Sequence, residues 1–100
     1  MKYELIPSRF FLEQLDGLSK ESKKLIESKL LLVKTNPYRF KKLEGFKLFL
    51  FRIRFQDNKK EKRVIYLVDK PKVKILCIID RDNDYKDLRS FLKRHNYHNS

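Results

Sequence analysis

The chain has 100 residues, of which 41% are hydrophobic, so residues 1–100 suit one domain with a modest core. Gly and Pro are scarce, which argues against a fibrous or disordered chain, and no apolar run reaches the length of a signal peptide or a membrane span. Twenty-five Lys and Arg against 13 Asp and Glu give a formal net charge of +12, so we expect a polyanionic partner, nucleic acid or an acidic protein, and no membrane.

Cysteine and histidine offer little chemistry. Cys77 is the single cysteine and lies in the apolar run VKILCIID, so we expect a buried, unreactive thiol and a reducing, cytoplasmic location. His95 and His98 have no thiol nearby that could complete a set of ligands. The sequence therefore predicts neither a metal nor a cofactor.

The N-terminal third predicts a strand followed by two helices. A short strand is expected over residues 2–6. Ser8 can cap a helix through RFFLEQLDGL, and Ser19 can cap a second helix through KESKKLIESKLLLVK, which ends before Asn36-Pro37. Because so few residues join the two helices, we expect them to form a helical hairpin that packs on a common partner.

The middle of the chain predicts an antiparallel sheet. Residues 38–47 are basic, aromatic and irregular, and strands are expected over about 48–56, 62–69 and 72–80. Asn58-Lys59 can form a two-residue hairpin turn between the first two of these strands.

That turn fixes which residues face one another. It places Arg54 opposite Arg63 and Arg52 opposite Ile65 on one face of the sheet. The other face pairs Phe51 with Tyr66, Ile53 with Val64 and Phe55 with Lys62, and its apolar character predicts that it packs against the two helices.

The C-terminal part predicts a buried strand and a last helix. The strand over 72–80 is apolar on both faces, and we expect it to be the central, most buried one. Asp82 or Asn83 can cap a final helix whose apolar stripe is Leu88, Phe91 and Leu92. The predicted fold is α+β with the order β-α-α-β-β-β-α, in which the helical hairpin covers one face of a small, mainly antiparallel sheet.

The arginines suggest phosphate recognition. Arg52, Arg54 and Arg63 share one face of the predicted sheet, and Arg81 and Tyr85 follow the last strand closely enough to reach its edge. A guanidinium is a rigid fork of donors that matches phosphate oxygens and stays charged at any accessible pH. One such arginine is more often solvated or ion-paired, but three on one face favour a site over a solvated surface.

Several segments in order resemble the RelE/ParE toxin superfamily. They are NPYRFKKLEGF, FRIRF, KRVIYLVD, VKILCIIDR and RDNDYK, and the resemblance covers nearly the whole chain. It implies the RelE fold and a small basic ribonuclease that uses no metal and cuts messenger RNA in the ribosomal A site, where the 2′-hydroxyl attacks the adjacent phosphate. It also implies a cognate antitoxin that blocks the toxin.

The resemblance also implies site residues. The basic residues of the family's second strand match Arg52 and Arg54, the arginine that opens its third strand matches Arg63, and its last two site residues match Arg81 and Tyr85. We expect further RNA contacts from five lysines: Lys41, Lys42, Lys47, Lys59 and Lys60.

Two departures from the family pattern concern proton transfer. Relatives often carry lysines where this chain has Arg52 and Arg54, and a guanidinium does not readily release a proton. Asp80 stands where many relatives have His or Lys, and an exposed carboxylate there would repel a phosphate. Two alternatives therefore stay open: a ParE-like gyrase inhibitor or catalytically inactive binding module, and a basic adaptor for structured RNA or an acidic protein.

Overall fold

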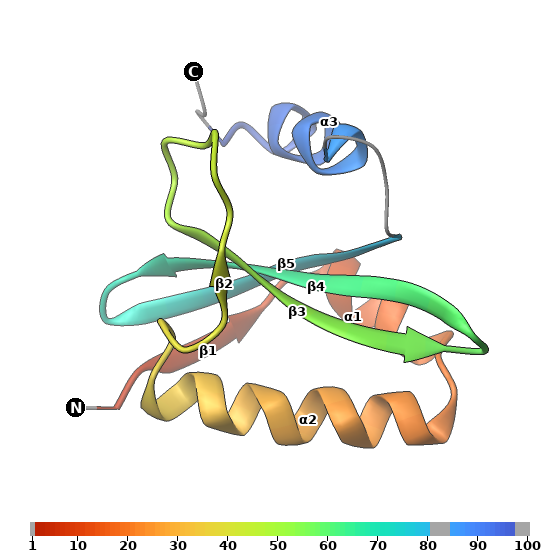
Figure 1. The fold of residues 1–100 in the computed structure, drawn as a ribbon. Helices are drawn as coiled ribbons and strands as arrows, with labels where there is room; N and C mark the ends of the chain where they lie inside the picture. Colours follow the sequence, from red (N-terminus) through yellow and green to blue (C-terminus); the bar gives the residue numbers. More distant parts are fainter. Residues whose placement is uncertain (1, 81–84, 98–100) are drawn as a thin grey trace.

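The computed structural model describes residues 2–80 and 85–97, and in that part of the chain three helices accompany a five-stranded sheet with the strand order β1-β5-β4-β3-β2 (Figure 1). β1 runs parallel to β5, whereas the other neighbours are antiparallel. The predicted α+β class is confirmed. In chain order the elements are β1 (Glu4–Pro7), α1 (Arg9–Asp16), α2 (Lys20–Thr35), β2 (Lys41–Lys42), β3 (Leu50–Asp57), β4 (Lys60–Asp69), β5 (Lys72–Asp80) and α3 (Lys86–Arg94).

Both helices of the hairpin begin at the predicted caps. The hydroxyl of Ser8 accepts a hydrogen bond from the backbone N–H of Phe11 at 3.0 Å, and the hydroxyl of Ser19 accepts one from Ser22 at 3.2 Å. These serines satisfy N–H groups that have no partner inside the helix. No helix among the described residues combines the length and the apolar character needed to cross a lipid bilayer.

The β3–β4 hairpin has the predicted register. Asn58 and Lys59 both have positive φ, 51° and 66°, as a two-residue turn of the type I′ kind requires. Arg54 therefore pairs with Arg63, and Arg52 pairs with Ile65. This register places the arginines on one face of the sheet and the apolar side chains of the same strands on the other.

Helices cover both faces of the sheet (Figure 1). One face packs against α1 and α2 around Phe11, Ile26, Val33, Ile53 and Tyr66, as predicted. The opposite face, which also carries the arginines, is partly covered by α3, in a second core of Leu50, Ile65, Leu67, Leu88, Phe91 and Leu92. The arginines thus lie beside an apolar cluster instead of on a fully open surface.

Three predictions about the fold need correction. β4 is the middle strand, because β1 adds to the outer edge of β5; β5 is still buried along most of its length. Lys41–Lys42 forms a short strand, β2, within the segment expected to be irregular. The N-cap of α3 is Tyr85, which makes no side-chain capping bond, whereas the predicted caps, Asp82 and Asn83, lie outside the described residues.

Candidate nucleic-acid interface

Three arginines and a tyrosine meet on the face that α3 partly covers. Arg52 and Arg63 each donate a hydrogen bond from Nη1 to the phenol oxygen of Tyr85, and both distances are 2.8 Å. Arg54 lies two residues beyond Arg52 on β3 and directly opposite Arg63. We call these four residues the arginine cluster. The structure therefore brings together four of the five predicted catalytic residues; Arg81 lies outside the described residues.

Tyr85 is held in an unusual backbone conformation. Its φ of 56° and ψ of 38° lie in the left-handed region, which residues other than Gly adopt mainly where surrounding contacts enforce it. Its ring contacts Phe46 edge-on at 6.2 Å between centroids, and the Arg63 guanidinium carbon lies 5.3 Å from its centroid. Because the two guanidinium groups occupy the acceptor lone pairs of the phenol, its own proton is left to donate to a third partner.

A carboxylate that the sequence analysis did not single out also contacts the cluster. Glu61 places one oxygen 3.3 Å from Nη2 of Arg54 and the other 3.5 Å from Nη2 of Arg63. The side chains of Glu61 and Arg63 are only 18% and 11% exposed, whereas that of Arg54 is 57% exposed. The available signal was the alternation of the strand, because Glu61 lies two residues before Arg63 and so shares its face.

The cluster carries concentrated, partly desolvated positive charge. The Nε atoms of Arg52 and Arg63 are buried and have no hydrogen-bond partner. Unsatisfied buried donors are unfavourable, and neighbouring guanidinium groups repel one another, so an anion that binds between them relieves both effects. The arrangement is therefore suited to a phosphate, whose oxygens can accept several charge-assisted hydrogen bonds.

Three of the five predicted RNA-binding lysines lie where they could extend the cluster. Lys41 pairs with Arg52 and so lies on the same face. Lys59 and Lys60 line an open hollow of ≈ 450 Å³ at the hairpin end, together with Gln56, Glu61 and Asp80, although Lys60 pairs in the sheet with Asp57, whose carboxylate faces α2. The other two lie apart: Lys42 pairs with Phe51 on the opposite face, and Lys47 lines a separate hollow beside Tyr97. An RNA contact at each of the five lysines stays a prediction.

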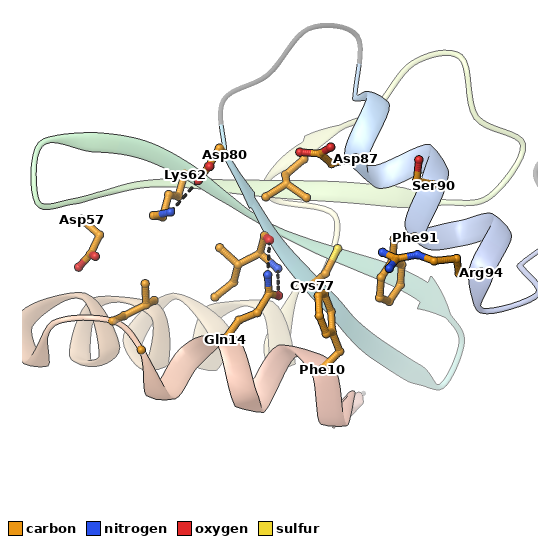
Figure 2. A pocket seen from close by; sticks show the side chains of 14 residues that line it. Phe10, Gln14, Asp57, Lys62, Cys77, Asp80, Asp87, Ser90, Phe91 and Arg94 are labelled. Carbon is orange, nitrogen blue, oxygen red and sulfur yellow. Dashed lines mark hydrogen bonds and ion pairs between the residues drawn. The ribbon is translucent and has the colours of Figure 1, made fainter.

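Asp80 is turned away from the arginines. It pairs with Lys62 in the sheet, and its carboxylate lies 2.6 Å from the Lys62 ammonium group (Figure 2). Paired residues share a face, and Lys62 in turn pairs with Phe55 on the face covered by α1 and α2. The charge of Asp80 is thus offset by a lysine, which reduces the repulsion of phosphate that the sequence suggested.

A second cleft lies at the free edge of β5, between α1 and α3 (Figure 2). It measures ≈ 520 Å³, and Phe10, Cys77 and Arg94 are among its lining residues. Cys77 is buried as predicted, and burial raises the pKa of its thiol to about 12, so it is a poor nucleophile. In the described part of the chain no three His, Cys, Asp or Glu side chains are grouped so that they could hold a metal ion.

One polar side chain closes the β5 edge in this cleft. Gln14 of α1 accepts a hydrogen bond from the backbone N–H of Ile78 at 2.6 Å and donates one to its carbonyl oxygen at 2.7 Å (Figure 2). Ser8 donates a further bond to the carbonyl of Leu76 at 2.6 Å. These bonds satisfy backbone groups beyond the point where β1 stops pairing with β5.

The chain resembles known proteins in its fold, whereas its sequence alone matches none of the families or curated proteins. No family profile and no curated protein sequence matches the chain. Three solved structures of E. coli proteins are similar. A RelE toxin variant with two arginines replaced by alanine, in the free state, has a TM-score of 0.75 and 18% identity over 95% of this chain and 98% of its own. The intact RelBE toxin–antitoxin complex matches with a TM-score of 0.69 and 19% identity over 81% and 99%, and the isolated RelE toxin with 0.67 and 20% over 93% and 98%. The chain therefore has the fold of the RelE toxin, as its resemblance to the RelE/ParE superfamily predicted.

Proposed function

We propose that the chain is the toxin of a type II toxin–antitoxin pair, a ribosome-dependent endoribonuclease that cuts messenger RNA in the A site without a metal. The observation that carries this proposal is the convergence of Arg52 and Arg63 on the phenol of Tyr85, next to Arg54. Guanidinium groups gathered around one hydroxyl suit a reaction in which negative charge grows on a phosphate and a proton moves to a leaving oxygen.

In this mechanism the residues have separate roles. Arg52, Arg54 and Arg63 hold the scissile phosphate and stabilise the additional charge that develops when the 2′-hydroxyl oxygen attacks phosphorus. Tyr85 donates its proton to the departing 5′ oxygen or stacks on a base of the message. Arg81 supports the leaving oxygen. Lys59 and Lys60 at the hairpin end and Lys41 on β2 attract the RNA backbone and raise the rate of association.

We further propose a cognate antitoxin as the protein partner. The similar RelBE structure is a toxin–antitoxin complex, and the formal charge of +12 on this chain favours an acidic partner. An antitoxin that covers the arginine cluster would compete directly with RNA for the same guanidinium groups. An adjacent reading frame that encodes a short acidic protein is the expected antitoxin gene, and its co-expression should restore growth to cells that express this chain.

Primer extension on translating ribosomes tests the proposed activity. Purified protein added to a programmed ribosome should produce cuts within the A-site codon, and none in the same message without ribosomes. Arg63→Ala and Arg81→Ala should each abolish the cuts and relieve growth arrest without unfolding the protein. Arg9→Ala is the matched control, because Arg9 is an exposed arginine on α1 whose side chain is 94% exposed. Absence of cuts with the unmodified protein would overturn the proposal.

A second candidate is a ParE-like gyrase inhibitor or an inactive relative that acts as a binding module. It is favoured by Glu61, which already engages two of the three arginines, and by arginine at both positions where relatives often carry lysine. In that case the protein should inhibit DNA supercoiling by gyrase, or bind its partner, and leave ribosome-bound messages intact. The two assays run on one preparation separate the candidates.

A further inference from the structure

The arginine cluster lacks a group that can accept a proton. A guanidinium stays protonated at accessible pH, so Arg52, Arg54 and Arg63 can stabilise charge but cannot deprotonate a hydroxyl. The Tyr85 phenol already receives two hydrogen bonds, and its proton is available to be given, not taken. Attack by a 2′-hydroxyl needs an acceptor elsewhere in the site.

We propose that Glu61 is this acceptor: its carboxylate takes the proton from the attacking 2′-hydroxyl. The assignment rests on the proposed ribonuclease function. Among the described residues, Glu61 is the carboxylate in contact with the arginine cluster, and it reaches two of the three arginines. A catalytic base must lie within hydrogen-bonding reach of the reacting group, and a carboxylate bonded to the arginines that would hold the phosphate lies beside the place where the 2′-hydroxyl would attack.

The strand geometry fixes the position of Glu61. It pairs with Gln56 across the hairpin and lies on the same face as Arg63, two residues further along β4. Each carboxylate oxygen contacts a different guanidinium, so the group is held between Arg54 and Arg63. This placement comes from the sheet instead of from a flexible loop, as a catalytic group requires.

Substrate can approach Glu61 from the open hollow at the hairpin end. The hollow of ≈ 450 Å³ is lined by Lys59 and Lys60 as well as Glu61 and Asp80, so it offers two cations to an RNA backbone that approaches Glu61. Arg54 is more than half exposed and can turn from Glu61 to a phosphate oxygen. That exchange would let the 2′-hydroxyl of the same nucleotide approach the carboxylate.

The proposed cleavage moves two protons. The 2′-hydroxyl proton passes to a Glu61 oxygen while the 2′ oxygen forms a bond to phosphorus. The bond from phosphorus to the 5′ oxygen breaks, and that oxygen takes the Tyr85 proton. The products are a 2′,3′-cyclic phosphate and a 5′-hydroxyl end. Glu61 then loses its proton to water and Tyr85 regains one from water, which restores the enzyme.

The competing role for Glu61 is that of a counter-ion that only restrains Arg54 and Arg63. The two roles predict opposite results for Glu61→Gln, which keeps the shape of the side chain but removes its charge and basicity. If Glu61 is the base, cleavage falls while RNA binds as well as before or more tightly, because a negative charge has left the site. If Glu61 is a counter-ion, cleavage persists or rises along with RNA binding.

The experiment measures single-turnover cleavage on programmed ribosomes, and binding of a message with a 2′-deoxy nucleotide at the scissile position. Glu61→Gln should slow cleavage by about 100-fold or more, while the uncleavable message binds as well as before or more tightly.

Two further variants make the test decisive. Glu61→Asp keeps a carboxylate but withdraws it by one methylene, so it should cleave about 10-fold more slowly than wild type but faster than Glu61→Gln, and it decides the case if Glu61→Gln does not fold. Glu4→Gln makes the same chemical change on β1, two strands from β4, and should behave as wild type. Cleavage by Glu61→Gln near the wild-type rate, or a parallel loss of RNA binding, would overturn the assignment of Glu61 alone. Failure of the wild-type protein to cleave would instead overturn the proposed function, and the assignment with it.

Discussion

Arg63 contacts Tyr85 in two ways, through a 2.8 Å hydrogen bond from Nη1 to the phenol oxygen and through the face of the ring, whose centroid lies 5.3 Å from the guanidinium carbon. The second Nη atom of Arg63 faces Glu61 at 3.5 Å. The planar fork of one arginine therefore links the two groups that we propose as proton donor and proton acceptor. A residue with a single charged atom could not make these contacts together.

Arg63→Lys should consequently inactivate the protein although it keeps the charge. A lysine offers one ammonium group in place of the fork, so we expect cleavage on ribosomes to fall by about 100-fold or more. The control is Arg9→Lys on α1, which should leave cleavage and melting temperature unchanged. Full toxicity of Arg63→Lys in a growth assay would show that charge alone suffices at this position.

Tyr85→Phe tests the phenol separately from the ring. The variant keeps the contacts of the ring with Phe46 and Arg63 but removes the proposed proton donor, so cleavage should fall by about 100-fold. Binding of the uncleavable message should change little, because the arginines remain. Tyr38→Phe, at an exposed tyrosine that packs on Phe51, is the control. Equal cleavage by Tyr85→Phe and wild type would leave stacking as the role of Tyr85.

Asp57 should link stability to pH. The Ser22 hydroxyl, followed by Ser19, donates hydrogen bonds that lower the pKa of the Asp57 carboxyl below its ordinary value of 3.8. Because the folded-state pKa is depressed, this stabilisation is fully present above about pH 3.8 and is lost as the pH falls through the folded-state value.

Thermal melting of wild type and Asp57→Asn checks this prediction. The variant should melt at lower temperature than wild type at pH 7, because it loses the charge-assisted bonds at the N-terminus of α2. The difference between the two proteins should shrink as the pH falls below about 3.8. A difference that stays constant down to pH 2 would contradict the proposed cause.

Lys59→Gly should separate stability from RNA binding. Lys59 has a φ of 66°, a conformation that disfavours a side chain by about 1–2 kcal/mol, whereas Gly adopts it freely. The greater freedom of Gly in the unfolded chain offsets about 0.4–1 kcal/mol of that gain, so the melting temperature should rise by a few degrees.

The same variant removes a predicted RNA contact. Binding should weaken, and the slope of log affinity against log salt concentration should become shallower by about 1, as expected when one phosphate contact is lost. Lys59→Asn is a useful companion, because Asn tolerates positive φ and also lacks the charge. An unchanged salt slope in both variants would remove Lys59 from the RNA interface.

Features that depend on neighbouring residues could be predicted from the sequence. Ser8 and Ser19 act within one helical turn, and the turn at Asn58-Lys59 fixes the pairing of every residue along β3 and β4. The convergence of Arg52, Arg54 and Arg63 follows from that pairing and the two-residue period of a strand. The candidate phosphate site could therefore be predicted from these elements.

Features that depend on contacts between residues far apart in the chain could not be predicted from the sequence. β1 pairs with β5 across more than 60 residues of chain, and β2 is too short to leave a pattern of its own. Tyr85 ends up as the N-cap of α3, although tyrosine is a poor capping residue. Glu61 sits in a run of lysines that resembles a solvated hairpin tip, and only the three-dimensional contacts show that its carboxylate joins two arginines.

The amide of Gln14 has a consequence for assembly. It makes hydrogen bonds with both the N–H and the carbonyl of Ile78, as the backbone of a neighbouring strand would. A side chain from α1 thus takes the place of one residue of a sixth strand. An edge strand with unpaired backbone N–H and C=O groups is a template on which other chains can dock or aggregate. Any polypeptide that adds a strand to this edge of β5 must first displace Gln14, so α1 hinders strand addition there.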